Sequence, residues 1–175
     1  MEEMFCFQCQ QTAHNSGCEG RAGVCGKKSD TANYQDELTG ALIGLSRAVR
    51  KKLALNPDAS FEHADELILK GLFTTITNVN FFNDTIIGLI HEVNVEKDRI
   101  YPDIMNYDVR HIWEDQEDIR SLKSLILFGL RGMAASAYHA YALDYTDRNV
   151  LDFFYEGLEA IASEKSSDEL LALVL

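Results

Sequence analysis

The sequence predicts an all-α protein, a helical bundle of about five to six helices preceded by an N-terminal cysteine-rich loop. Two observations indicate this fold class. All four cysteines lie within the first 25 of 175 residues. After them, apolar side chains recur at intervals of three and four residues, which is the period of an amphipathic α-helix. We therefore expect residues 1–30 to form the loop and residues 31–175 the bundle, packed together as one domain.

Composition and charge are typical of a globular protein that binds neither nucleic acid nor membrane. Hydrophobic residues make up 46% of the chain and charged residues 25%. The formal net charge of −12 would repel a phosphate backbone. No apolar run approaches the length of about 18 residues that a membrane helix needs. The chain starts with Met1-Glu2-Glu3 and lacks the basic and apolar regions of a signal peptide, so we expect a cytoplasmic protein.

The first half of the bundle is expected to contain three helices. Residues 29–33 offer N-cap side chains for the first, which should end near Asn56-Pro57 because the residue before proline disfavours helical conformation. Helical spacing continues over residues 61–79 and begins again at Ile86. The β-branched residues 74–77 would suit a strand, but their neighbours keep helical spacing and no hairpin signal flanks them.

The second half is expected to contain two long helices after a loop. Residues 100–113 include Pro102 and the only tryptophan and break the helical period, so we expect a loop there. The next helix is predicted to be the longest and to run to Tyr141. It opens with four carboxylates within residues 114–118, which complement the positive end of the helix dipole. A further helix is predicted over residues 150–161.

The C-terminal end combines a helix start with an apolar run. Ser166 and Glu169 have the spacing of a capping box. Residues 170–175 are all apolar, and so short a helix is marginal in isolation. We therefore expect this segment to dock on something, either a second copy in a homodimer or a partner chain.

The cysteines are the candidate functional residues. They are spaced C-x2-C-x8-C-x6-C, at Cys6, Cys9, Cys18 and Cys25. Thiolate is a soft ligand that selects iron-sulfur clusters or zinc, and the short first gap lets two thiolates converge on one centre. Glycines at positions 17, 20, 23 and 26 tolerate positive φ and allow the loop to wrap tightly. This composition suits a cofactor site better than a packed core.

Three interpretations of the cysteines compete: a cubane iron-sulfur cluster, a structural zinc ion, or two disulfides. The absence of a secretory signal disfavours disulfides. Zinc sites usually repeat the short pair, whereas six residues separate the second pair here, so an iron-sulfur cluster is favoured. The zinc alternative would make the chain a zinc-stapled helical interaction module without redox activity. The cations Arg21, Lys27 and Lys28 would either offset the negative charge of a cluster or simply be solvated.

Several motifs together resemble the front part of the hybrid cluster proteins, also called hydroxylamine reductases or prismane proteins. They are residues 4–13 (MFCFQCQQTA), Gly17-Cys18, Cys25-Gly26-Lys27, residues 69–78 (LKGLFTTITN) and residues 117–122 (EDIRSL). The resemblance covers nearly all of this chain but only the N-terminal helical part of the family's much longer one. It implies that the four cysteines bind one [4Fe-4S] cluster, with a [2Fe-2S] cluster or zinc less favoured, and that this cluster passes electrons.

The resemblance also implies what this chain lacks. In the family, hydroxylamine is reduced to ammonia at a second, hybrid cluster held by Cys, His and Glu side chains of later domains. With all four cysteines assigned, no thiolate remains here for that centre, so we do not expect a hybrid cluster or independent catalysis on this chain. We expect a C-terminus truncated relative to the family, and a redox partner protein or the missing catalytic domains as partners.

Overall fold

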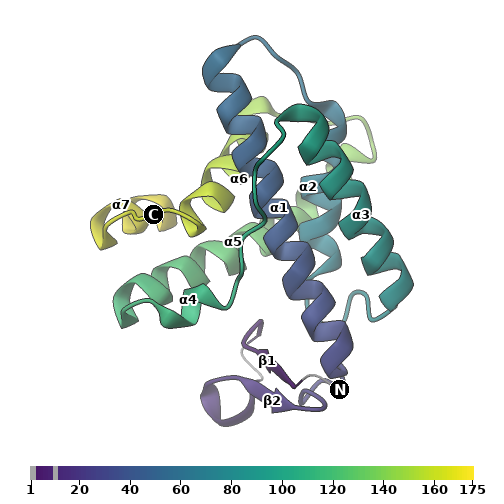
Figure 1. Ribbon diagram of the computed structural model, residues 1–175, viewed down its shortest axis with the longest axis vertical. Coiled ribbons are helices and arrows are strands. Elements are labelled where there is room, and N and C mark those ends of the chain that lie inside the picture. Colours follow the sequence, from purple (N-terminus) through teal and green to yellow (C-terminus); the bar gives the residue numbers. More distant parts are fainter. Residues whose placement is uncertain (1–2, 10–11) are drawn as a thin grey trace.

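The computed structural model describes residues 3–9 and 12–175 and confirms the all-α class (Figure 1). Residues 1–2 and 10–11 of the expected loop lie outside the described residues. Within the described part, the helices are α1 (Ser29–Leu55), α2 (Glu62–Thr74), α3 (Asn83–Ile100), α4 (His111–Glu114), α5 (Glu117–Tyr141), α6 (Arg148–Ile161) and α7 (Ser167–Val174). Two short strands, β1 (Met4–Cys6) and β2 (Cys18–Gly20), and the 3-10 turn η1 (Ala13–Asn15) precede them.

The first helix is the centre of the bundle. α1 contacts α2, α3 and α6, which surround it in Figure 1. Of the apolar residues expected on one face of this helix, Leu38, Leu42, Leu45 and Val49 are 0% exposed, whereas Leu53 near its end is half-buried. α5 forms the second contact surface, packing on α2, α6 and α7. The small sheet lies at the end of the bundle where α1 begins (Figure 1).

Two details of the predicted helices are wrong. The longest helix is α1, with 27 residues, and not α5, with 25. α2 ends at Thr74 and does not reach residue 79. The Thr75 hydroxyl donates to the Leu72 carbonyl at 2.8 Å, and Asn78 adopts a φ of +65°, so the chain after Thr74 forms turns rather than helix or strand.

A third detail is also wrong, because α1 begins at Ser29 with Lys28 at its N-cap and without a side-chain cap hydrogen bond. Two elements were not predicted. The loop after α3 contains the four-residue helix α4, and the cysteine loop contains the two-stranded sheet. At α7 the capping box is present. The Ser166 side chain accepts a hydrogen bond from the Glu169 backbone N–H, and the Glu169 side chain accepts one from the Ser166 backbone N–H. Leu170 is fully buried beside α5, whereas Leu171 and Leu175 are exposed. Within the described residues, no helix combines the length and apolar character needed to cross a membrane.

Candidate functional site

Two of the four predicted ligands face each other across the small sheet. Cys6 ends β1, Cys18 begins β2, and the antiparallel register pairs them directly. Directly opposed residues of an antiparallel pair point to the same face of the sheet. Both cysteines are buried in a small cluster with Met4 and Ala32. Strand pairing therefore sets two thiols side by side although they lie far apart in the sequence.

Cys9 and Cys25 join them around one small cavity. All four thiols are free, and all four line this cavity. The turn that carries Cys25 closes when the Gly23 backbone N–H donates to the Lys27 carbonyl at 2.8 Å. Gly26 has a φ of +84° in this turn, a conformation that favours glycine. As a result Cys25 Sγ lies 3.6 Å from the position where a Cβ on Gly23 would stand.

The donor set fits an iron-sulfur cluster. Four cysteine thiolates around one cavity are the ligands such clusters use. Over residues 3–9 and 12–175, no three Cys, His, Asp or Glu side chains gather closely enough to hold a single metal ion. The structure therefore brings the four predicted side chains to one cavity without converging them on one point.

A buried lysine contacts Cys6. Lys27 is 1% exposed, and its ammonium nitrogen lies 3.9 Å from Cys6 Sγ. It donates to Gln8 Oε1 at 3.1 Å and to Gln35 Oε1 at 2.5 Å. Burial raises the pKa of the Cys6 thiol, and the positive charge of Lys27 is the strongest effect opposing that rise. Lys27 therefore favours the thiolate that a metal or cluster requires.

Aromatic packing holds the first cysteine strand against the bundle. The Trp113 ring, at the end of α4, meets Phe5 and Phe7 edge to face, with ring centroids 4.8 and 4.9 Å apart. These two phenylalanines flank Cys6 in the sequence. The Arg120 guanidinium lies over the Trp113 ring, 4.8 Å from its centroid. The position of Cys6 thus depends on a residue more than a hundred positions away.

The comparison with known families matches the Prismane/CO dehydrogenase family over residues 4–175. The chain belongs to this family. Its similarity to known family proteins extends over almost the whole chain. It is 37% identical to a hydroxylamine reductase of Desulfitobacterium hafniense (strain Y51), an alignment that covers 98% of this chain and 36% of that protein.

Two further relatives show similar identity and coverage. The hydroxylamine reductase of Caldanaerobacter subterraneus subsp. tengcongensis is 36% identical, with 99% of this chain and 36% of the relative covered. That of Nitratidesulfovibrio vulgaris Hildenborough is 33% identical, with 98% and 36% covered. This prismane-family chain therefore spans about a third of the length of the curated relatives it matches. The predicted resemblance to one part of the family is confirmed.

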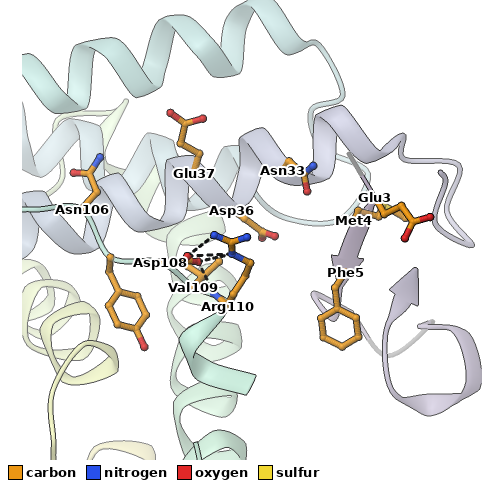
Figure 2. A pocket seen from close by; sticks show the side chains of 11 residues that line it. Glu3, Met4, Phe5, Asn33, Asp36, Glu37, Asn106, Asp108, Val109 and Arg110 are labelled. Carbon is orange, nitrogen blue, oxygen red and sulfur yellow. Dashed lines mark hydrogen bonds and ion pairs between the residues drawn. The ribbon is translucent and has the colours of Figure 1, made fainter. Parts of the chain in front are cut away.

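A second cavity, whose lining residues are drawn in Figure 2, shares Met4 with the cysteine cavity. It lies between β1, the first turns of α1 and the segment before α4, and its lining includes Asn33, Asp36 and the ion-paired Asp108 and Arg110. Burial raises the pKa of Asp36 to about 6, while Arg131 and a hydrogen bond from Gln8 oppose the rise. Asp36 and Gln8 therefore connect this cavity to Lys27.

Three residues around the cysteine cavity were not found by sequence analysis. Gln8 and Gln35 orient Lys27, yet no local pattern marks a glutamine as the partner of a distant lysine. Trp113 had one available signal, because it is the only tryptophan and stands in a segment that breaks the helical period. Its contact with Phe5 and Phe7 joins segments that no helical or strand period relates.

Proposed function

We propose that this chain is an electron-transfer module that holds one [4Fe-4S] cluster. The proposed ligands are Cys6, Cys9, Cys18 and Cys25. The observation that carries the proposal is the single cavity lined by all four free thiols. Family membership supports it, because prismane-family proteins bind iron-sulfur clusters. When bound, such a cluster supplies a reversible one-electron couple.

The side chains around the cavity would tune and shield that couple. Cys6 and Cys18 lie on the buried side, where water is excluded. Cys25 lies on the more open side, next to Val24, which is 65% exposed. We propose that electrons enter near Val24 by outer-sphere transfer, since this side brings a docked redox protein closest to the cavity. The thiols would remain reduced in the cytoplasm, where we propose the protein works.

We propose that the electrons continue to a catalytic hybrid cluster held outside this chain. The relatives named hydroxylamine reductases are nearly three times as long as the matched region. The partner would be either the catalytic part of such an enzyme or a separate redox protein. The chain alone would then reduce no hydroxylamine, and ammonia formation by the loaded 175-residue protein with a reduced viologen would refute this division of labour.

The deciding experiment is anaerobic purification followed by iron, sulfide and zinc analysis. We expect about four iron and four sulfide per chain, with a broad visible absorption that bleaches on addition of dithionite. Cys25→Ser should lose most of the iron, because it removes a proposed ligand. Ser16→Ala is the matched control. Ser16 is exposed and lies between Cys9 and Cys18, so its substitution should leave the iron content unchanged.

A different metal content would replace the proposal. About one zinc per chain and no visible absorption would instead support the zinc-stapled interaction module. About two iron and two sulfide would retain electron transfer with a [2Fe-2S] cluster. Equal iron in Cys25→Ser and wild type would show that the cavity is not the binding site.

The predicted docking role of the C-terminal apolar segment leads to a separate proposal. Leu171, Val174 and Leu175 are 43%, 39% and 97% exposed on and after α7. We propose that they contact a second copy of the chain. Mass measurement in solution should then give a dimer for wild type and a monomer for Leu171→Glu, whereas a wild-type monomer would contradict the homodimer.

A further inference from the structure

Among residues 3–9 and 12–175, the hydrogen-bond partners of the buried Lys27 ammonium include no carboxylate oxygen. The ammonium nitrogen meets the amide oxygens of Gln8 and Gln35, the Cys6 sulfur and, 5.8 Å from the ring centroid, Phe81. By contrast, the buried Lys123 bonds to the Asp115 carboxylate at 2.8 Å. A third buried lysine, Lys97, bonds to the side-chain oxygens of Asn94 and Asn106 and also lies 3.6 Å from the Asp98 carboxylate. Lys27 therefore differs from both in having no carboxylate among its hydrogen-bond or ion-pair partners in the described part of the chain.

This arrangement is costly unless an anion stands nearby. Removing an ammonium from water costs several kcal/mol unless it is paired, and amide oxygens solvate a charge without neutralising it. The Cys6 sulfur, 3.9 Å away, is the direct contact of Lys27 that can carry a negative charge, whereas the Asp36 carboxyl reaches the ammonium only through Gln8. A thiolate bound to a metal cluster would provide that charge. The lysine position is thus explained by an anionic sulfur.

The two glutamines are themselves held in one orientation. Gln8 Nε2 donates to Asp36 at 2.9 Å, and Gln35 Nε2 donates to the Asn80 carbonyl at 2.8 Å. With each amide nitrogen engaged elsewhere, each amide oxygen faces Lys27. The ammonium is therefore fixed from two directions. Arg21 and Lys28, the other cations of this segment, are exposed.

We propose that Lys27, clamped by Gln8 and Gln35, is a positioning residue that raises the reduction potential of the cluster on the cysteines. This inference rests on the proposed function. Reduction adds one electron from an external donor, here dithionite, and one negative charge to the cluster, with no bond made or broken. A fixed positive charge beside Cys6 stabilises the reduced form more than the oxidised form. Removing that charge should make the cluster harder to reduce.

The test compares two identical substitutions at neighbouring lysines. Lys27→Met replaces the buried cation with a neutral side chain of similar length, and Lys28→Met is the exposed control. The loaded proteins are titrated anaerobically with dithionite and mediators, and the visible spectrum reports the midpoint. At the wild-type midpoint, the reduced-to-oxidised ratio should fall at least tenfold in Lys27→Met, about 59 mV for a one-electron couple. Lys28→Met should change it less than twofold.

A second variant covers the case in which Lys27→Met does not fold or load. Gln35→Glu keeps the shape of the clamp but places a carboxylate against the ammonium, which offsets its charge. It should shift the midpoint in the same direction. Unchanged midpoints in the loaded variants, or the same shift in Lys28→Met, would overturn the role of Lys27. Wild-type protein without iron and sulfide would instead refute the proposed function, so the two failures are distinguishable.

Discussion

Gly40 offers the sharpest test of how the bundle holds the site. It lies within α1, where the segment leading to α4 crosses the helix, and its carbonyl accepts a hydrogen bond from the Tyr107 backbone N–H at 3.1 Å. A Cβ added to Gly40 would stand 2.1 Å from the Tyr107 carbonyl oxygen. That distance is far inside van der Waals contact, and the obstructing atom is backbone. Gly40→Ala must therefore push the two segments apart.

The expected cost follows from the contacts that must change. Overpacking of this kind costs about 1–3 kcal/mol, and loss of the Tyr107 hydrogen bond adds about 1 kcal/mol. Alanine regains about 1 kcal/mol of helix propensity. We expect Gly40→Ala to lower the free energy of unfolding by about 2 kcal/mol. Because the displaced segment leads to Trp113, which packs on Phe5 and Phe7, iron release should also be faster.

Urea unfolding of the anaerobic, loaded protein, followed by far-UV circular dichroism, measures this cost. Gly88→Ala is the matched control, because Gly88 lies inside α3 and no atom stands within 4 Å of its added Cβ. It should stabilise the protein by up to about 1 kcal/mol. If Gly40→Ala unfolds at the same or a higher urea concentration than wild type, the close crossing of α1 is refuted.

Three further substitutions test other parts of the structure. Burial raises the pKa of Asp36 to about 6 from its ordinary 3.8, so ionisation destabilises the folded state as pH rises through this window. The free energy of unfolding of Asp36→Asn should therefore exceed that of wild type by up to about 3 kcal/mol at pH 7.5. Urea titrations at pH 4 should show no such gain. Tyr155→Phe removes the 2.6 Å hydrogen bond to the buried Asp65 and should cost about 1–3 kcal/mol of unfolding free energy, whereas an unchanged urea midpoint would contradict this. Ser166→Ala removes the α7 cap and should cost about 1 kcal/mol, or less if α7 frays independently, as amide hydrogen exchange would show.

Local patterns were sufficient to predict most of the helices. The apolar period of α1 and the start signal of α7 depend on residues within one or two turns of each other, and both predictions are confirmed. The α2 prediction was wrong at its end because the hydroxyl of Thr75 bonds back to the helix and Asn78 turns the chain, neither of which changes the apolar period. Periodicity alone therefore locates helices better than it locates their ends.

Some features of the candidate site could likewise be predicted from local sequence, and others could not. The cysteine set was readable from spacing and residue chemistry, and the structure gathers its members around one cavity. Whether Lys27 or Lys28 was the buried cation was not readable, since the two are adjacent and chemically identical. Their difference arises because Gln35 on α1 and Gln8 after β1 enclose only Lys27.

The sequence by itself determined the all-α class, the central apolar face of α1 and the four candidate ligands. Only the tertiary structure decided that Cys6 lies opposite Cys18 in the two-stranded sheet, that Lys27 is buried and that Gly40 must lack a side chain. The physical reason is the distance along the sequence between the residues that interact. Helical period and capping act between residues a few positions apart, whereas burial, strand pairing and close backbone crossings depend on segments that meet only when the chain has folded.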